Sequence, residues 1–211
     1  MKKAVVSILL FLMVFVAYTQ EINHQNISQA VLNSLPEWLA RIPVGDEISY
    51  GFQNREEFSR AVLGTPVEVF VLGKNFYTQT DREIQLTSIG EWRIPVVVDQ
   101  KNCALVTVIK QNGEWKIVDF GAAGLAGELN NFGKQLTDEQ FRKIKMIRIY
   151  QPLSDFLFYD DPLSNPDQIV LLPFRSASQY LESQDSQTKK TWTLSEVATI
   201  LHKLISIQNQ E

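Results

Sequence analysis

The chain has 211 residues, of which 45% are apolar and 21% charged, an ordinary balance for a globular protein of about one domain. Its 24 acidic residues outnumber its 20 lysines and arginines, giving a formal net charge of −4. Nucleic-acid binding depends on clustered basic side chains, so this composition argues against a nucleic-acid partner.

The N-terminus has the pattern of a secretory signal peptide. Lys2 and Lys3 precede an uncharged run, residues 4–17, and the triplet Ala17-Tyr18-Thr19 offers a small-x-small cleavage site. The alternative is a membrane anchor, but 14 residues are short for a span of about 20. We therefore expect residues 1–20 to be removed, leaving a mature chain without a membrane span and with a formal net charge of −6.

Cysteine usage limits the chemistry of the exported chain. Cys103 is the single cysteine, so an intramolecular disulfide is excluded. None lies near the predicted cleavage site, which predicts a periplasmic or extracellular protein that is not a lipoprotein. A thiol nucleophile would need a positioned histidine, and His24 and His202 lie near opposite ends of the chain. Cys103 is therefore expected to be a buried structural thiol.

The N-terminal part of the mature chain predicts helices. Residues 27–39 carry apolar side chains at helical spacing, and Pro36 either kinks this helix or starts a second one. Asn54 is placed to cap a further helix that runs to Leu63 and stops at Gly64. A short strand is predicted at residues 67–72, after a loop. Residues 84–89 alternate weakly between apolar and polar side chains, which indicates an extension of the strand that contains Trp92.

Residues 92–120 form the strongest sheet signal. Asn112-Gly113 predicts a type I′ hairpin turn. Five cross-strand pairs follow from it: Lys110–Trp115, Ile109–Lys116, Val108–Ile117, Thr107–Val118 and Val106–Asp119. One face then carries Val106, Val108, Trp115 and Ile117, and the other carries Leu105, Ile109, Val118 and Phe120, with Cys103 on the Leu105 side. Both faces are apolar and should be covered, which makes Trp115 an expected core residue. Pro95 predicts an edge or a bulge in the preceding strand.

The second half alternates helices and strands. We expect a helix within residues 125–132, a short helix capped by Thr137, and strands at 146–150, 156–159 and 169–172. A helix from Ser176 or Ser178, a polar linker at 182–190 and a final helix at 194–205 capped by Thr193 complete the chain. The predicted class is α+β, with helices packed on a mainly antiparallel meander sheet and extended by a C-terminal α/β part. Residues 21–211 are expected to form one domain, with a possible subdivision near 121–137.

Several motifs suggest chemistry, but none is complete. The run GAAGLAG at 121–127 lacks phosphate-loop spacing and is better explained by close packing of a helix on the sheet. The loop DDPLSNPDQ at 160–168 concentrates oxygen ligands without a calcium-loop pattern and reads as a solvated turn. Asp81, Asp99 and Asp119 are the acids near the sheet. The sequence predicts no catalytic, cofactor-binding or metal-binding residue.

The order of elements over residues 27–120 resembles the cystatin-like group of folds, which includes nuclear-transport-factor-like proteins. The hairpin LVTVIKQNGEWKIVDFG at 105–121 is similar to those of exported bacterial proteins in this group. The resemblance implies a small binding or accessory domain, since few members are enzymes. The protease-blocking motif QxVxG is absent, so the resemblance does not extend to protease inhibition.

These observations predict an exported, non-enzymatic binding or accessory protein whose partner is an unknown protein or small-molecule ligand. Two alternatives remain open. One is a pocket-type enzyme that uses a carboxylate as a base. The other is a peptide- or protein-interaction module that uses a sheet edge, for which the strand with Pro95 is the candidate.

Overall fold

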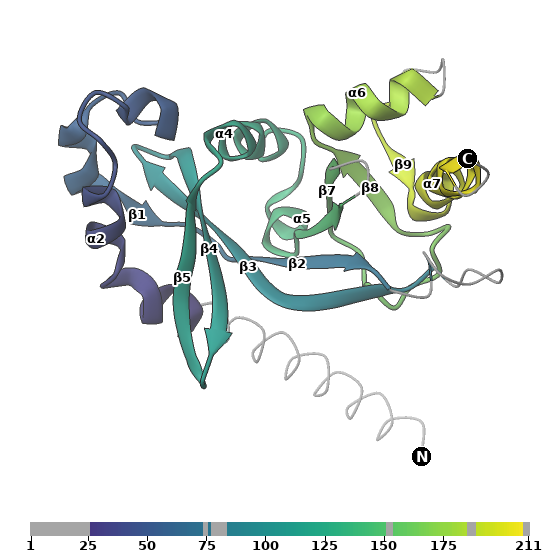
Figure 1. The fold of residues 1–211 in the computed structure, drawn as a ribbon, viewed down its shortest axis with the longest axis horizontal. Helices are drawn as coiled ribbons and strands as arrows, with labels where there is room; N and C mark the ends of the chain where they lie inside the picture. The colour runs from purple at the N-terminus through teal and green to yellow at the C-terminus, as the bar shows by residue number, and fades with distance from the viewer. Residues whose placement is uncertain (1–25, 74–75, 77–83, 151–153, 185–188, 209–211) are drawn as a thin grey trace, which may run out of the picture.

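The computed structural model describes residues 26–73, 76, 84–150, 154–184 and 189–208. Its centre is a nine-stranded sheet with strand order β5-β4-β3-β2-β6-β7-β8-β9, and β1 also pairs with β3 (Figure 1). In the described pairings β2 and β6 run parallel and the others antiparallel. The predicted α+β class with a mainly antiparallel sheet is confirmed.

The strands have the following bounds: β1 Val62–Leu63, β2 Val67–Leu72, β3 Leu86–Val98, β4 Lys101–Gln111, β5 Glu114–Gly121, β6 Lys145–Ile149, β7 Ser154–Phe158, β8 Val170–Pro173 and β9 Trp192–Thr193. The helices are α2 Leu35–Ala40, η1 Glu47–Tyr50, η2 Arg55–Arg60, α4 Ala123–Phe132, α5 Asp138–Arg142, α6 Arg175–Gln184 and α7 Leu194–Gln208, and residues 26–32 are also helical. The helix predicted after Asn54 is a 3-10 helix, η2, that ends before β1, so Gly64 follows a strand.

The N-terminal helices cover one face of β3, β4 and β5. The buried residues of this N-terminal cluster are Ile27, Val31, Leu35, Leu39, Ile42, Phe52, Trp92, Ile94, Val96, Val98, Cys103, Ala104, Val106, Val108 and Ile117. The predicted helical stripe at 27–39 is therefore a core surface. Pro36 stands in the first turn of α2, where a missing N–H costs no helical hydrogen bond, and so separates α2 from the helix before it.

Helix α4 covers the opposite face, which we call the α4 face. Its buried cluster is Val67, Val69, Leu105, Ala126, Leu129, Phe132, Ile144, Met146, Leu157, Leu172 and Phe174. Leu105 and Val106 are consecutive in β4 and enter different clusters, as side chains alternate along a strand. The prediction that both faces of the hairpin are covered is confirmed at Leu105 and wrong toward the turn, where Val118 is 41% exposed and Trp115 is half-buried instead of a core residue.

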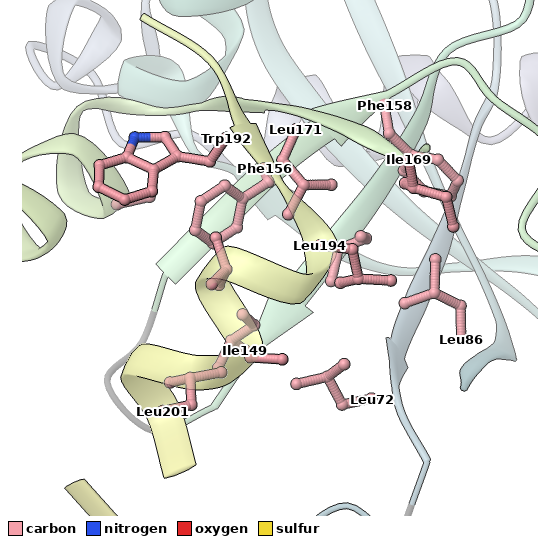
Figure 2. Packing of buried hydrophobic residues seen from close by; sticks show 14 of the residues in the cluster. Leu72, Leu86, Ile149, Phe156, Phe158, Ile169, Leu171, Trp192, Leu194 and Leu201 are labelled. Atoms are coloured by element: carbon pink, nitrogen blue, oxygen red, sulfur yellow. The ribbon is translucent and has the colours of Figure 1, made fainter. Parts of the chain in front are cut away.

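The C-terminal helix docks on the second half of the sheet. Leu194, Val197, Ala198 and Leu201 are each at most 2% exposed, and Figure 2 shows Leu194 and Leu201 of α7 among side chains of β6, β7 and β8. Thr193 and Glu196 exchange the two hydrogen bonds of a capping box, at 3.2 and 2.9 Å. The predicted cap is confirmed, and the helix buries its described apolar side chains against the sheet.

The predicted register of the central hairpin is correct near its turn and wrong beyond it. Asn112 and Gly113 have φ of 53° and 86°, as a type I′ turn requires. The ladder then shifts between Thr107 and Val108, so that Thr107 pairs with Asp119 and Val106 with Phe120. Val118 is the extra residue of a β-bulge and is 41% exposed.

This bulge moves Phe120 to the face of the N-terminal helices. Its ring stacks on Tyr50 and Phe52, with centroids 6.0 and 6.4 Å apart. A second shift in the ladder, between Val96 and Val97, brings Cys103 into the N-terminal cluster as well. The predicted burial of Cys103 is confirmed, but its predicted face is wrong for this reason.

The strand that contains Pro95 is an interior strand. β3 pairs with β4 on one side and with β1 and β2 on the other, and Pro95 lies between the parts of β3 that pair with β1 and β2. Its carbonyl oxygen accepts a hydrogen bond from Gly64 N at 2.7 Å. The missing N–H of Pro95 is thus accommodated beside a bulge, and the alternative of an edge is wrong.

Candidate functional site

The three acids singled out in the sequence have different surroundings. Asp99 forms an ion pair with Arg60 at 3.1 Å, and their side chains are 68% and 48% exposed. This is a surface pair of small energetic value. Asp81 lies outside the described residues. Asp119 is the acid that the fold places beside other functional groups, on the α4 face.

Asp119 belongs to a charged cluster with Glu91, Arg93 and Thr107, which we call the Arg93 cluster. Register places Arg93, Thr107 and Asp119 side by side across β3, β4 and β5, because paired residues share a face. Arg93 Nε donates to Glu91 Oε1 at 2.9 Å, and its Nη1 lies 3.8 Å from Asp119 Oδ2. Thr107 Oγ1 donates to the same Asp119 oxygen at 3.5 Å.

Burial shows how this cluster is held. The Arg93 side chain is 8% exposed and that of Glu91 is 20% exposed, while that of Asp119 is 68% exposed. A buried guanidinium needs a close carboxylate, and Glu91 supplies it. Asp119 forms the solvent side of the cluster. The acid and base charges compensate one another, an arrangement that favours structural or recognition roles over proton transfer.

A second pair lies on the same face of β6 and β7. Arg148 donates to both carboxylate oxygens of Asp155, at 2.9 and 3.4 Å, and the two side chains are 23% and 13% exposed. Burial acts to lower the pKa of Arg148, but the hydrogen bond and charge of Asp155 outweigh it and raise that pKa. This pair continues the polar part of the α4 face beyond the helix.

The oxygen-rich loop at 160–168 uses its oxygens for local turns. Side-chain oxygens of Asp160, Asp161 and Asn165 each accept a backbone N–H at 2.9–3.0 Å. Such side-chain-to-backbone bonds are the usual reason for Asp and Asn in turns. Within the described part of the chain, no three His, Cys, Asp or Glu side chains are grouped so that they could hold a metal ion.

The glycine-rich run begins α4 but is not its contact surface. A Cβ added at Gly121, Gly124 or Gly127 would meet nothing within 4 Å, whereas Ala126 is fully buried against the sheet. The helix is fixed instead by Asn130, whose side chain accepts from Asn102 N at 2.9 Å and donates to Asn102 O at 3.1 Å. The prediction of close helix–sheet packing holds for Ala126 and is wrong for the three glycines.

Cys103 and His202 both have structural surroundings. Cys103 is 4% exposed, and burial raises the pKa of its thiol, which disfavours the reactive thiolate. The His202 ring stacks on Phe76 with centroids 4.3 Å apart, on the far side of the fold from Cys103. His24 lies outside the described residues.

The described structure includes a small cavity and an open groove. One, of about 10 Å³, is enclosed by α6, α7 and the β6–β7 pair and has the size of a single water molecule. The other is an open groove of about 530 Å³ between the helical residues 26–32 and β1, lined by Asn26, Ser28, Gln29, Leu32, Val62 and Leu63. Asp99 and Asp119 line neither of these, and the carboxylate-base alternative stays a prediction.

The β5 edge is the longer end of the sheet. β5 has eight residues and, among the described elements, pairs with β4 alone, whereas the other end is the two-residue strand β9. In an antiparallel pair alternate residues turn their N–H and C=O groups away from the partner. Figure 1 shows the tip of the β4–β5 hairpin reaching past the other coloured elements at the lower side of the view.

Sequence reasoning assigned the edge to the wrong strand. The available signal was connectivity: β5 is the last strand of a meander and is followed directly by a helix, so no later neighbouring strand covers it. Pro95 was a stronger local signal, but it lies in an interior strand, between the parts of β3 that pair with β1 and with β2.

No family model, curated protein or solved structure matches this chain. Within the described residues, no helix is both long enough and apolar enough to cross a membrane. The function is therefore inferred from the geometry of the chain itself.

Proposed function

We propose that this protein is an exported, non-enzymatic binding or accessory protein that binds a protein partner by strand addition at β5. The observation that carries this proposal is the outer edge of the eight-residue strand β5, at the end of the sheet, where no described strand pairs with it. An extended segment laid along such an edge gains main-chain hydrogen bonds and can place alternate side chains on both faces.

The side chains around this edge give a partner something to contact. Val118 is 41% exposed, and Trp115 and Phe120 are half-buried on the face of the N-terminal helices. Lys116 and Asp119 present opposite charges on the α4 face, with side chains 47% and 68% exposed. The bulge at Val118 limits regular pairing to short stretches, so the partner must accommodate it.

Site-specific photo-cross-linking in the cells that produce the protein tests this function. A photoreactive amino acid is placed at Val118, and at Val44, which is 85% exposed and lies outside β5. We expect a discrete cross-linked species from position 118 and none from position 44. No adduct from position 118, or the same adducts from both positions, would refute the proposed use of this edge.

Export is part of the proposal and rests on the basic and apolar pattern of residues 1–20. Intact-mass measurement of protein recovered from the envelope or the medium is expected to give a chain that begins near Glu21. A full-length mass in the membrane fraction would contradict it.

A further inference from the structure

We propose that the strand added at β5 is β5 of a second copy of this chain. The two strands run antiparallel about a two-fold axis between Ile117 and Val118. This inference rests on the proposed use of the β5 edge and names the partner at that edge. It follows from the pattern of faces along the strand and from the charges that the pattern brings together.

The bulge makes the face pattern of β5 symmetric about its middle. Lys116 and Asp119 pair with Ile109 and Thr107, which both lie on the α4 face. Trp115 and Phe120 pair with Lys110 and Val106, which both lie on the opposite face. Counted outward from the midpoint between Ile117 and Val118, the second residue on each side (Lys116 or Asp119) faces α4, and the third (Trp115 or Phe120) faces the N-terminal helices.

A strand with this symmetry can pair with its own copy without a conflict of faces. Residues opposite each other in an antiparallel pair must share a face. In a regular strand, a two-fold axis between two residues would set opposite faces against each other, because alternation has period two. The extra residue Val118 removes that mismatch. The bulge therefore allows self-pairing about an axis beside Val118, and the side chains decide between the registers that remain.

The same register brings complementary side chains together. Lys116 of each copy lies opposite Asp119 of the other, which gives two opposite-charge pairs across the axis. Trp115 lies opposite Phe120 of the second copy, and Ile117 opposite Val118. A shift of two residues toward the turn would instead place Glu114 opposite Asp119, two like charges, so charge and face patterns favour the same alignment.

Nothing else in the described structure competes strongly for these groups. Lys116 Nζ lies 3.6 Å from Glu114 Oε2, a loose contact between exposed side chains. Asp119 Oδ2 accepts a long hydrogen bond from Thr107 Oγ1 at 3.5 Å and lies 3.8 Å from Arg93, whose closer partner is Glu91 at 2.9 Å. Lys116 and Asp119 can both turn toward a second copy without leaving a buried charge uncompensated.

A charge-exchange experiment tests the pairing. The mature chain, Lys116→Glu, Asp119→Lys and an equimolar mixture of these two variants are compared by sedimentation velocity at low salt over a range of concentrations. Each variant alone faces like charges across the axis, whereas the mixture restores both opposite-charge pairs. We expect the unaltered chain to dimerise, each variant to dimerise at least about tenfold more weakly, and the mixture to recover a heterodimer.

Lys101→Glu is the matched control, since it makes the same charge change at an exposed residue at the far end of β4. It is expected to dimerise as the unaltered chain does. Circular dichroism and melting temperature establish that each variant is folded. If Asp119→Lys does not fold, hydrogen exchange of the unaltered chain decides: β5 amides are expected to exchange more slowly as concentration rises.

The outcomes separate this inference from the proposed function. A chain that stays monomeric at the highest concentration reached, or a mixture that fails to associate, overturns the second-copy inference. If Val118 still cross-links to another protein in that case, strand addition at β5 stands with a different partner. If Val118 cross-links to nothing, both proposals fail.

Discussion

Replacing Gly51 with alanine perturbs the contact between the N-terminal segment and the sheet. Gly51 ends η1 with φ of 89°, in the left-handed region. A Cβ at this position would lie 2.0 Å from the carbonyl oxygen of Cys103 and 2.8 Å from its carbonyl carbon. These are backbone atoms of β4, so no side-chain rotation can relieve the overlap. Either η1 or the strand must move.

The cost can be estimated from two contributions. A left-handed conformation costs an L-residue about 1–2 kcal/mol relative to glycine. Forcing an extra carbon into a packed contact typically costs about 1–3 kcal/mol more. We therefore expect Gly51→Ala to lower the free energy of unfolding by roughly 2–5 kcal/mol.

Gly45→Ala is the matched control for this change. Gly45 has φ of 96°, but an added Cβ there would meet nothing within 4 Å. It carries the conformational cost alone, about 1–2 kcal/mol. Urea denaturation of the two variants and the unaltered chain gives the difference at constant m-value. If Gly51→Ala cost no more than Gly45→Ala, the close approach of η1 to β4 would be refuted.

Three further predictions concern the core and its charges. Trp115→Ala should lower the free energy of unfolding by about 1–3 kcal/mol and Trp92→Ala by about 3–5 kcal/mol, because Trp115 is half-buried and Trp92 is 6% exposed. Equal losses for the two variants in urea denaturation would contradict this. The hydrogen bond from Arg55 at 2.7 Å, together with two backbone N–H groups, lowers the pKa of Glu47 below 4.5. The ionised Glu47 therefore stabilises the folded chain above that pH, and this stabilisation is lost as the pH falls through the lower pKa of the folded state. The urea midpoint of Glu47→Gln should therefore fall less than that of the unaltered chain on acidification below pH 4.5, and parallel curves would oppose the assignment. Removal of residues 191–211 should lower the single melting transition and expose dye-binding surface, because α7 buries Leu194 and its neighbours; an unchanged transition would show that the helix is not part of the core.

Local signals in the sequence predicted much of the fold because they act over a few residues. The Asn112-Gly113 turn, the Thr193–Glu196 and Thr137–Gln140 capping boxes and the stripe of α7 each depend on neighbours close in the chain. The structure reproduces each of them. The resemblance to cystatin-like folds and the extent of the single domain are not tested by these local features and stay predictions.

Long-range pairing was beyond such signals. The parallel pairing of β2 with β6 joins the two halves of the chain into one sheet, and it leaves no mark in the composition of either strand. Nor did the sequence predict β9, since a two-residue strand has no measurable periodicity. Both depend on which elements meet in space.

The Arg93 cluster was missed for a related reason. A regular ladder would place Asp119 with Val106, toward the N-terminal helices, and would leave it without a partner. The bulge at Val118 turns it to the α4 face, beside Thr107 and Arg93. A single extra residue exchanges the faces of every residue after it. An unrecognised bulge therefore gives the wrong core residues and the wrong neighbours for an acid such as Asp119.

Deletion of Val118 tests whether this one residue alone causes the shift in the β4–β5 ladder. The pairs Val108–Ile117 and Thr107–Asp119 flank it, and Ile117 and Asp119 already lie on opposite faces. Joining them should give a regular ladder in which Phe120 still packs on Tyr50. We expect a change in stability of less than about 1 kcal/mol, since no buried contact is lost. Deletion of Thr107 from the facing strand is the control, because it moves β4 residues from one covered face to the other and should unfold the chain. If deletion of Val118 destabilised the chain as much as deletion of Thr107 does, the bulge itself would be required for the fold.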